Sequence, residues 1–268
     1  MSHLLREHAP ITDATWRLID EEAVERLRPA LAARKLVDFV GPLGWEHSAT
    51  NLGRVQSIET APGVDGVSAA QRRVLPVAEL RADFSLSRAE LRAGDRGAAD
   101  VDLGPLATAA RRIAIAENRA VFHGWEAAGI TGITQASTLE PLALGENCEL
   151  YPRHVATAVE ALLSAGVEGP YGLALGPAAY RRVLQTAEHG GYPLLEHLRE
   201  IIGGPLVWSP GVDGAVVVSL RGGDFLFESG EDLSIGYESL DAERVNLFLI
   251  ESFTFRVAEE DAAVTLTP

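Results

Sequence analysis

The side chains that could do chemistry in this chain are few and scattered. It holds one cysteine, Cys148, and seven histidines, and no two of them lie at the spacing of a zinc site. The patterns of a phosphate-binding loop, a dinucleotide-binding turn, a metalloprotease helix and a calcium loop are all missing. The run 221–224, Arg-Gly-Gly-Asp, has the glycines of a phosphate cradle, but no Lys-Ser/Thr pair follows it, so a tight turn is favoured.

Two features leave a catalytic role open. Serines, histidines and aspartates occur as in almost any chain, but no G-x-S-x-G elbow presents a serine, so a hydrolase is not favoured. Glu251 lies in an apolar run and could be a functional carboxylate with a shifted pKa, although a structurally paired carboxylate is the favoured interpretation. The residues alone therefore predict no catalytic site and no metal site.

The elements that would position any site are a mixture of helices and strands. The clearest is the run 245–257, where Val, Leu and Phe alternate over both faces, which predicts a long strand covered on each side. Helical spacing begins after Thr12 or Asp13, and Pro29 is expected to stop or kink that helix. The other expected elements are helices at 105–124, 152–165, 177–183 and 194–202, and strands at 34–40, 171–175 and 215–220, with loops at 93–99 and 131–151.

Residues 51–85 have a different character. Weak strands at 55–58 and 69–75 flank the turn cluster 62–66, and 77–84 alternates cleanly. A long hairpin with little apolar mass is not stable alone in water, so it must lie on another surface. It is either an ordinary edge hairpin of its own domain or an arm that packs on neighbouring subunits.

Composition narrows the functional class. The chain has 268 residues, 47% of them hydrophobic, which is enough for one large or two modest domains. The net charge of −15 argues against nucleic acid as the main partner. No signal peptide, membrane span or disulfide pair is visible, so a cytoplasmic protein is expected.

Several short runs, in one order over the whole chain, resemble the encapsulin shell proteins of the family 1 type, a family also labelled linocin or bacteriocin. The closing runs 221–225, 232–237 and 251–255 are the most specific. The other matching runs are Leu4-Leu5-Arg6, Ala9-Pro10-Ile11-Thr12, Trp16, Gly41-Pro42-Leu43-Gly44-Trp45-Glu46, Phe122-His123-Gly124-Trp125, Gly129-Ile130-Thr131-Gly132-Ile133 and Gly169-Pro170-Tyr171.

This resemblance implies an α+β fold similar to the major capsid proteins of tailed phages of the Hong Kong 97 type. Residues 1–50, 81–134 and 223–268 would form a peripheral domain, 51–80 an extended loop and 135–222 an axial domain. The implied function is non-enzymatic: about 60 copies close into an icosahedral shell around a dye-decolourising peroxidase or a ferritin-like protein. The alternatives are a phage capsid protein of the same fold and a hydrolase or bacteriocin.

The resemblance also implies two sites. A C-terminal peptide of the cargo would bind between the N-terminal helix and the peripheral domain, and a loop at the axial tip would line a pore where five copies meet. Family members that bind a flavin carry a Trp where this chain has Ala89, which argues against a cofactor. The matching cargo positions are Leu27, Leu31, Arg34, Leu36, Asp38, Phe39, Ile235 and Tyr237, and the matching pore positions are Glu188, His189, Gly190, Gly191 and Tyr192.

Overall fold

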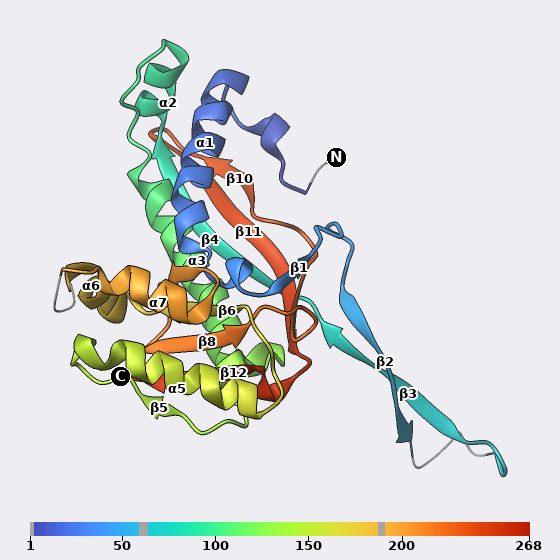
Figure 1. Cartoon of the computed structure of the whole chain (residues 1–268). Helices are drawn as coiled ribbons and strands as arrows, with labels where there is room; N and C mark the ends of the chain where they lie inside the picture. The colour runs from blue at the N-terminus through green and yellow to red at the C-terminus, as the bar shows by residue number, and fades with distance from the viewer. Residues whose placement is uncertain (1–2, 59–63, 187–190) are drawn as a thin grey trace.

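The computed structural model contains two five-stranded sheets and a separate two-stranded hairpin (Figure 1). It describes residues 3–58, 64–186 and 191–268. The helices and strands confirm the predicted α+β class. The first sheet has the order β1-β9-β11-β10, with β4 also paired to β11. Its strands are β1 (Asp38–Val40), β4 (Ala78–Ser87), β9 (Phe225–Ser229), β10 (Ser234–Leu240) and β11 (Arg244–Val257).

β11 is the centre of the first sheet, as its two apolar faces predicted. It pairs antiparallel with β10 and β4 along its first part and with β9 along its last part. Every residue from Leu247 to Thr254 has 6% or less of its surface exposed. A strand that is buried on both faces must be covered by other elements on each side.

Three helices pack beside this sheet, and α3 lies directly on β4 and β11. α3 begins with Pro105 in its first turn, which suits the missing N–H of proline. The shared core holds Trp16, Ile19, Leu106, Ile113 and Leu247. The three helices are α1 (Asp13–Ala30), α2 (Arg88–Asp95) and α3 (Gly104–His123).

The expectation that Pro29 ends α1 is wrong by two residues. The helix runs through Pro29 to Ala30, and the N–H of Leu31 still donates to the carbonyl of Leu27. Pro29 stands in the last turn, where the helix has few bonds left to lose.

The buried amide of Asn118 on α3 then holds the end of α1 in place. Its Nδ2 donates to the carbonyls of Ala30 (2.8 Å) and Pro210 (2.9 Å). Its Oδ1 accepts from the N–H groups of Ala32 (3.1 Å) and Ala33 (3.0 Å). One side chain thus satisfies four buried backbone groups and fixes where α1 stops.

The second sheet has the order β5-β12-β8-β6-β7. Its helices α5, α6 and α7 lie around it in the lower half of Figure 1. β6 and β8 are buried at every position, as their unbroken apolar runs predicted. The elements are β5 (Leu142–Ala143), β6 (Tyr171–Leu175), β7 (Leu206–Trp208), β8 (Ala215–Ser219), β12 (Ala263–Thr267), α4 (Ile133–Ala136), α5 (Tyr151–Ser164), α6 (Pro177–Gln185) and α7 (Leu194–Ile202).

β12 ties the end of the chain to this second sheet. It pairs antiparallel with β8 and parallel with β5. Residues 263–267, which the sequence assigned to the peripheral domain, therefore share a sheet with strands of the predicted axial domain. The three-part division itself stays a prediction, and one hydrophobic core continues from the second sheet to Phe227 and Phe253 of the first.

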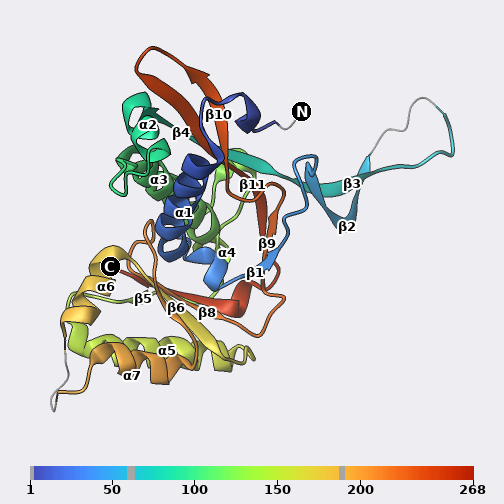
Figure 2. The same cartoon turned by 90° about the horizontal axis from the view of Figure 1, so that it is seen from above.

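The hairpin of β2 (Ala49–Ile58) and β3 (Ala69–Pro76) projects away from both sheets (Figures 1 and 2). The two strands pair only with each other among the described residues. Large apolar side chains on it are solvent-exposed, including Val55 at 65% and Val64 at 61%. A two-stranded ribbon of this kind needs a partner surface for stability.

Three local predictions from the sequence are wrong. The expected strand 34–40 is a 3₁₀ turn, η2 (Ala33–Lys35), followed by only three strand residues. Part of the expected loop 93–99 belongs to α2, which Ser87 caps by accepting a hydrogen bond from the N–H of Ala89. In the expected irregular stretch 131–151, short pieces α4 and β5 form because the second sheet supplies their partners.

Candidate functional site

A groove runs between α1 and the start of β10. It has a volume of about 230 Å³. Most of its lining is apolar, and Arg6 and Asp20, paired at 2.7 Å, also line it. Such a surface suits an extended peptide that inserts apolar side chains. The groove is lined by Leu4, Arg6, Asp20, Ala23, Val24, Leu27, Leu233, Ser234, Ile235 and Leu249.

Two of the eight residues predicted to bind a cargo peptide, Leu27 and Ile235, line this groove. Both are also part of the core, with exposures of 6% and 4%. Leu31 and Tyr237 pack against the same core cluster without lining the groove. The N–H of Tyr237 donates to the carbonyl of Leu4 at 2.8 Å, which attaches the N-terminal segment to β10.

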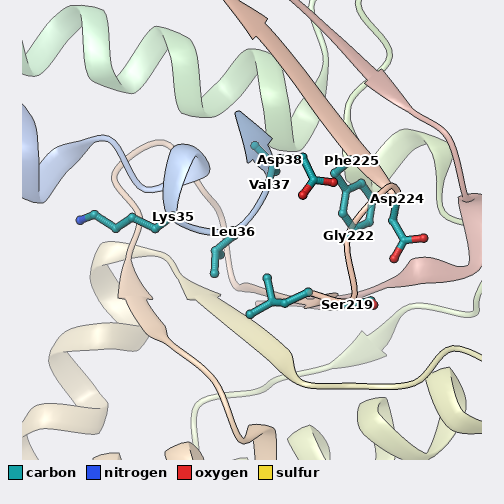
Figure 3. A pocket seen from close by; sticks show the side chains of 9 residues that line it. Lys35, Leu36, Val37, Asp38, Ser219, Gly222, Asp224 and Phe225 are labelled. Carbon is teal, nitrogen blue, oxygen red and sulfur yellow. The ribbon is translucent and has the colours of Figure 1, made fainter. Parts of the chain in front are cut away.

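Leu36 and Asp38 line a different cavity, of about 220 Å³, between η2 and the turn after β8 (Figure 3). Asp38 Oδ2 accepts a hydrogen bond of 2.5 Å from the N–H of Gly223. Lys35 lies at this cavity and points away from Asp38 and Asp224 (Figure 3). Asp38 therefore fixes the turn that the sequence analysis favoured over a phosphate cradle at 221–224.

Phe39 is partly buried and packs against the core. Its ring stacks on that of Phe227, with centroids 5.4 Å apart. The eight predicted residues thus do not form one pocket. Two line the groove, two pack against its core cluster, two line the cavity at η2, and the remaining two, Phe39 and Arg34, line neither.

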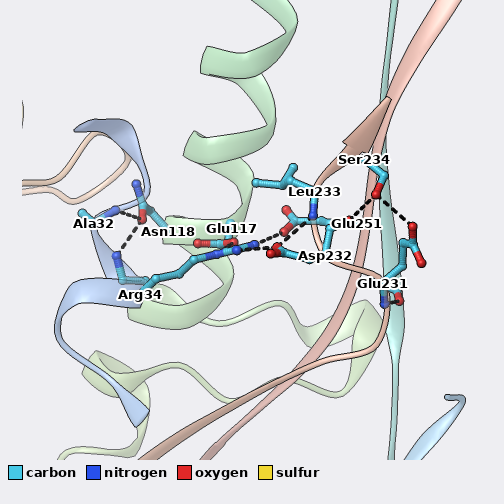
Figure 4. A network of polar contacts seen from close by, with 11 residues as sticks. Ala32, Arg34, Glu117, Asn118, Glu231, Asp232, Leu233, Ser234 and Glu251 are labelled. Atoms are coloured by element: carbon cyan, nitrogen blue, oxygen red, sulfur yellow. Dashed lines mark hydrogen bonds and ion pairs between the residues drawn. The ribbon is translucent and has the colours of Figure 1, made fainter. Parts of the chain in front are cut away.

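Arg34 stands in a buried network of carboxylates (Figure 4). Its Nε donates to Glu117 at 2.6 Å, and its Nη1 donates to Asp232 at 2.6 Å. Its Nη2 donates to Glu251 at 2.8 Å. Arg34 was assigned to a peptide on the argument that a core does not need it. That argument is wrong for this chain, because the buried Glu117 and Glu251 and the half-exposed Asp232 hold its guanidinium.

Burial and the neighbouring charges shift the pKa values in this network. Desolvation opposes the charge of Arg34, but the attraction of Glu117, Glu251 and Asp232 outweighs it and raises the Arg34 pKa. Desolvation raises the pKa of Glu117. Desolvation and the neighbouring charge of Glu117 raise the pKa of Glu251 well above its ordinary value. The favoured interpretation of Glu251 as a structurally paired carboxylate is confirmed.

Two side chains that line the groove, Val24 and Leu233, were not predicted from the sequence as part of the site. Val24 is 51% exposed on α1, and Leu233 is half-buried just before β10. The signal for Val24 was present, because it interrupts the charged outer face of a helix whose buried positions are Trp16, Ile19 and Leu27. Leu233 had no such signal, since only the fold brings it opposite α1.

The predicted pore residues fall mostly outside the described residues. This applies to Glu188, His189 and Gly190. Gly191 has a φ of +82°, and Tyr192 donates from its hydroxyl to Glu200 at 2.7 Å. The pore stays a prediction, as does the expected absence of a flavin at Ala89.

Within residues 3–58, 64–186 and 191–268, no group of three or more His, Cys, Asp or Glu side chains is arranged to hold a metal ion. In the same ranges, no helix combines the length and apolarity of a membrane span.

Solved capsid structures share this fold. The chain aligns with the virus-like particle from Pyrococcus furiosus with a TM-score of 0.66 at 17% identity, covering 94% of this chain and 98% of the other. It aligns with a chain of Microbacterium phage Oxtober96 with a TM-score of 0.55 at 12% identity, covering 88% and 90%. The chain therefore has the fold of the tailed-phage capsid proteins, as predicted.

The chain belongs to the Linocin_M18 family, described as "Encapsulating protein for peroxidase", whose model matches residues 1–254. It is 48% identical to the type 1 encapsulin shell protein of Rhodospirillum rubrum, over 99% of this chain and 96% of the relative. It is 39% identical to that of Mycobacterium tuberculosis, over the full length of both. The predicted self-assembling shell protein, structural rather than enzymatic, is confirmed.

Proposed function

We propose that about 60 copies of this chain close into an icosahedral compartment that encloses a peroxidase. The family description names peroxidase as the enclosed protein, which favours it over the ferritin-like alternative. As part of the same proposal, the compartment lies in the cytoplasm of a bacterium or archaeon.

The groove between α1 and β10 is the proposed dock for a C-terminal peptide of the cargo. The observation that carries this assignment is an apolar lining, in which Leu27 and Ile235 are nearly buried and the neighbouring Val24 is 51% exposed. A peptide laid along the groove would place alternate side chains against these apolar residues. Ser234 at its edge offers a hydroxyl, which is held by Glu231 at 2.8 Å.

Retention of cargo would come from many weak contacts. A groove of about 230 Å³ accepts only a few side chains, so one peptide should bind weakly. A cargo with several subunits presents several peptides to many docks on one inner surface, and the combined affinity exceeds that of each contact. Of the other predicted residues, Leu31 and Tyr237 act on the dock through the packing of α1 and β10.

Val24→Asp tests the dock without disturbing the core. We expect shells that assemble normally but hold at least about tenfold less cargo, because a desolvated carboxylate would oppose the apolar peptide side chains. Cargo and shell are co-expressed, intact shells are purified, and the cargo-to-shell ratio is measured on gels.

Leu163→Asp is the matched control. Leu163 has a similar exposure of 54% but lies on α5, outside the groove. Its shells should load cargo as the unaltered chain does. Full loading of the Val24→Asp shells would show that the peptide binds elsewhere.

A further inference from the structure

The network at Arg34 contains more carboxyl groups than one cation can neutralise. Glu117 comes from α3, Glu251 from β11, and Asp232 from the segment before β10. The side chains of Glu117 and Glu251 have 0% and 1% of their surface exposed, whereas that of Asp232 has 44%. Solvent therefore screens Asp232, while the two glutamates share the buried side of a single guanidinium.

Each glutamate uses only one oxygen on Arg34. Oε2 of Glu117 and Oε2 of Glu251 accept its hydrogen bonds. Oε1 of each is buried and has no hydrogen-bond partner among the described residues. The two carboxyl groups lie within hydrogen-bonding reach of each other. Two ionised carboxylates in this position would repel each other and leave both of these oxygens unsatisfied.

One proton would resolve both problems. A protonated carboxyl of one glutamate donates its O–H to an oxygen of the other, so that both orphaned oxygens gain a partner. The buried charge then balances, with one carboxylate against one guanidinium. Two charged groups face the pair: Arg34 from η2 and Asp232 from the segment before β10. Arg34 is the one cation of this network, and Asp232 adds a further negative charge.

We propose that Glu117 and Glu251 hold one proton between them at neutral pH, and that this shared proton locks α3 and β11 together as a pH-sensitive joint of the shell subunit. Through Arg34, the segment that follows α1 is bonded to both glutamates. Through Asp232, the segment that leads into β10 is bonded to Arg34. Loss of the proton leaves an unbalanced negative charge in the centre of this packing.

The direction of the pKa shifts agrees with a retained proton, since burial raises the pKa of both Glu117 and Glu251. A carboxyl whose pKa is higher in the folded chain binds more protons folded than unfolded. Its contribution to stability is complete below the ordinary glutamate pKa and is lost as the pH rises through the folded value. The joint therefore weakens toward alkaline pH, not toward acid.

Infrared spectroscopy of assembled shells tests the proton directly. At about pH 8, ordinary Asp and Glu side chains are ionised, so a protonated carboxyl gives a separate carbonyl stretching band. We expect that band in the unaltered shell. We expect it to disappear in both Glu251→Gln and Glu117→Gln, because either change leaves one carboxylate to be neutralised by Arg34 alone.

The matched control is Glu196→Gln, which alters an exposed carboxylate that pairs with Arg199 at 2.7 Å. It should leave the band unchanged. Absence of the band from the unaltered shell would overturn the proposal, even if a glutamine variant failed to fold. Persistence of the band in either glutamine variant would also overturn it.

The pH dependence of unfolding gives an independent readout. Between about pH 6 and pH 9, the unfolding constant of the unaltered subunit should rise by up to about tenfold per pH unit relative to Glu251→Gln, whose amide cannot lose the proton. Parallel curves for the two proteins would contradict a shared proton that stabilises the fold.

Discussion

Shortening the hairpin of β2 and β3 is expected to abolish shell formation while the subunit still folds. Residues 57–70 are removed, and Gln56 is joined to Gln71 through an Asn-Gly turn. Gln56 and Gln71 are paired across the hairpin, so the remaining strands keep their register. The two five-stranded sheets lose no strand pairing by this deletion, because β2 and β3 pair only with each other in the described ranges.

We expect this effect because the hairpin exposes apolar side chains at a distance from the two sheets of its own chain. Val64 and Val67 lie in the removed part and are 61% and 54% exposed in the single chain. Exposed apolar side chains on an unsupported two-stranded ribbon fit contact with neighbouring copies. Without these contacts, a closed shell lacks an interface that every copy would otherwise form.

Electron microscopy and size-exclusion chromatography measure this outcome, and far-UV circular dichroism checks that the shortened subunit is folded. We expect small species with native-like secondary structure. Closed particles of the unaltered size would show that assembly does not require the hairpin tip.

Replacing Arg34 with Met is expected to destabilise the subunit by about 3–5 kcal/mol, the cost of leaving a buried carboxylate without its cation. The change removes the hydrogen bonds to Glu117 and Glu251, whose side chains are almost fully buried. The two glutamates have no other cation in the network. Chemical unfolding followed by circular dichroism measures the loss.

Two further variants make this prediction specific. Arg26→Met removes an exposed partner of Glu22 on α1, paired at 2.7 Å, and should have little effect. Adding Glu117→Gln and Glu251→Gln to Arg34→Met should restore much of the stability, since no buried charge then remains. Equal behaviour of Arg34→Met and Arg26→Met would contradict a buried network that depends on its cation.

The sequence predicted best where periodicity and burial agree. The alternation at 245–257 indicated a strand that is covered on both faces, and β11 occupies that position. The helix from Pro105 was equally clear, because apolar side chains repeat at helical spacing along α3. In both elements, local pattern and tertiary packing favour the same structure.

The predictions failed where distant residues decide the local structure. α1 continues past Pro29 because Asn118, far away in the sequence, holds the carbonyl of Ala30. β12 forms because β8 offers it a free edge, which no local pattern reveals. The candidate site shows the same limit. The resemblance correctly indicated Leu27 and Ile235 as residues that line the groove. Only the fold shows that Arg34 is instead bound by Glu117, Asp232 and Glu251.

The mass of the purified assembly decides whether this chain builds a shell. We expect closed particles in the megadalton range, about 1.7 MDa for about 60 copies of a 28.6 kDa chain. Mass photometry of the freshly purified protein measures this without further treatment. A protein that remains a monomer or a small oligomer under these conditions would contradict the claim that this chain builds a shell.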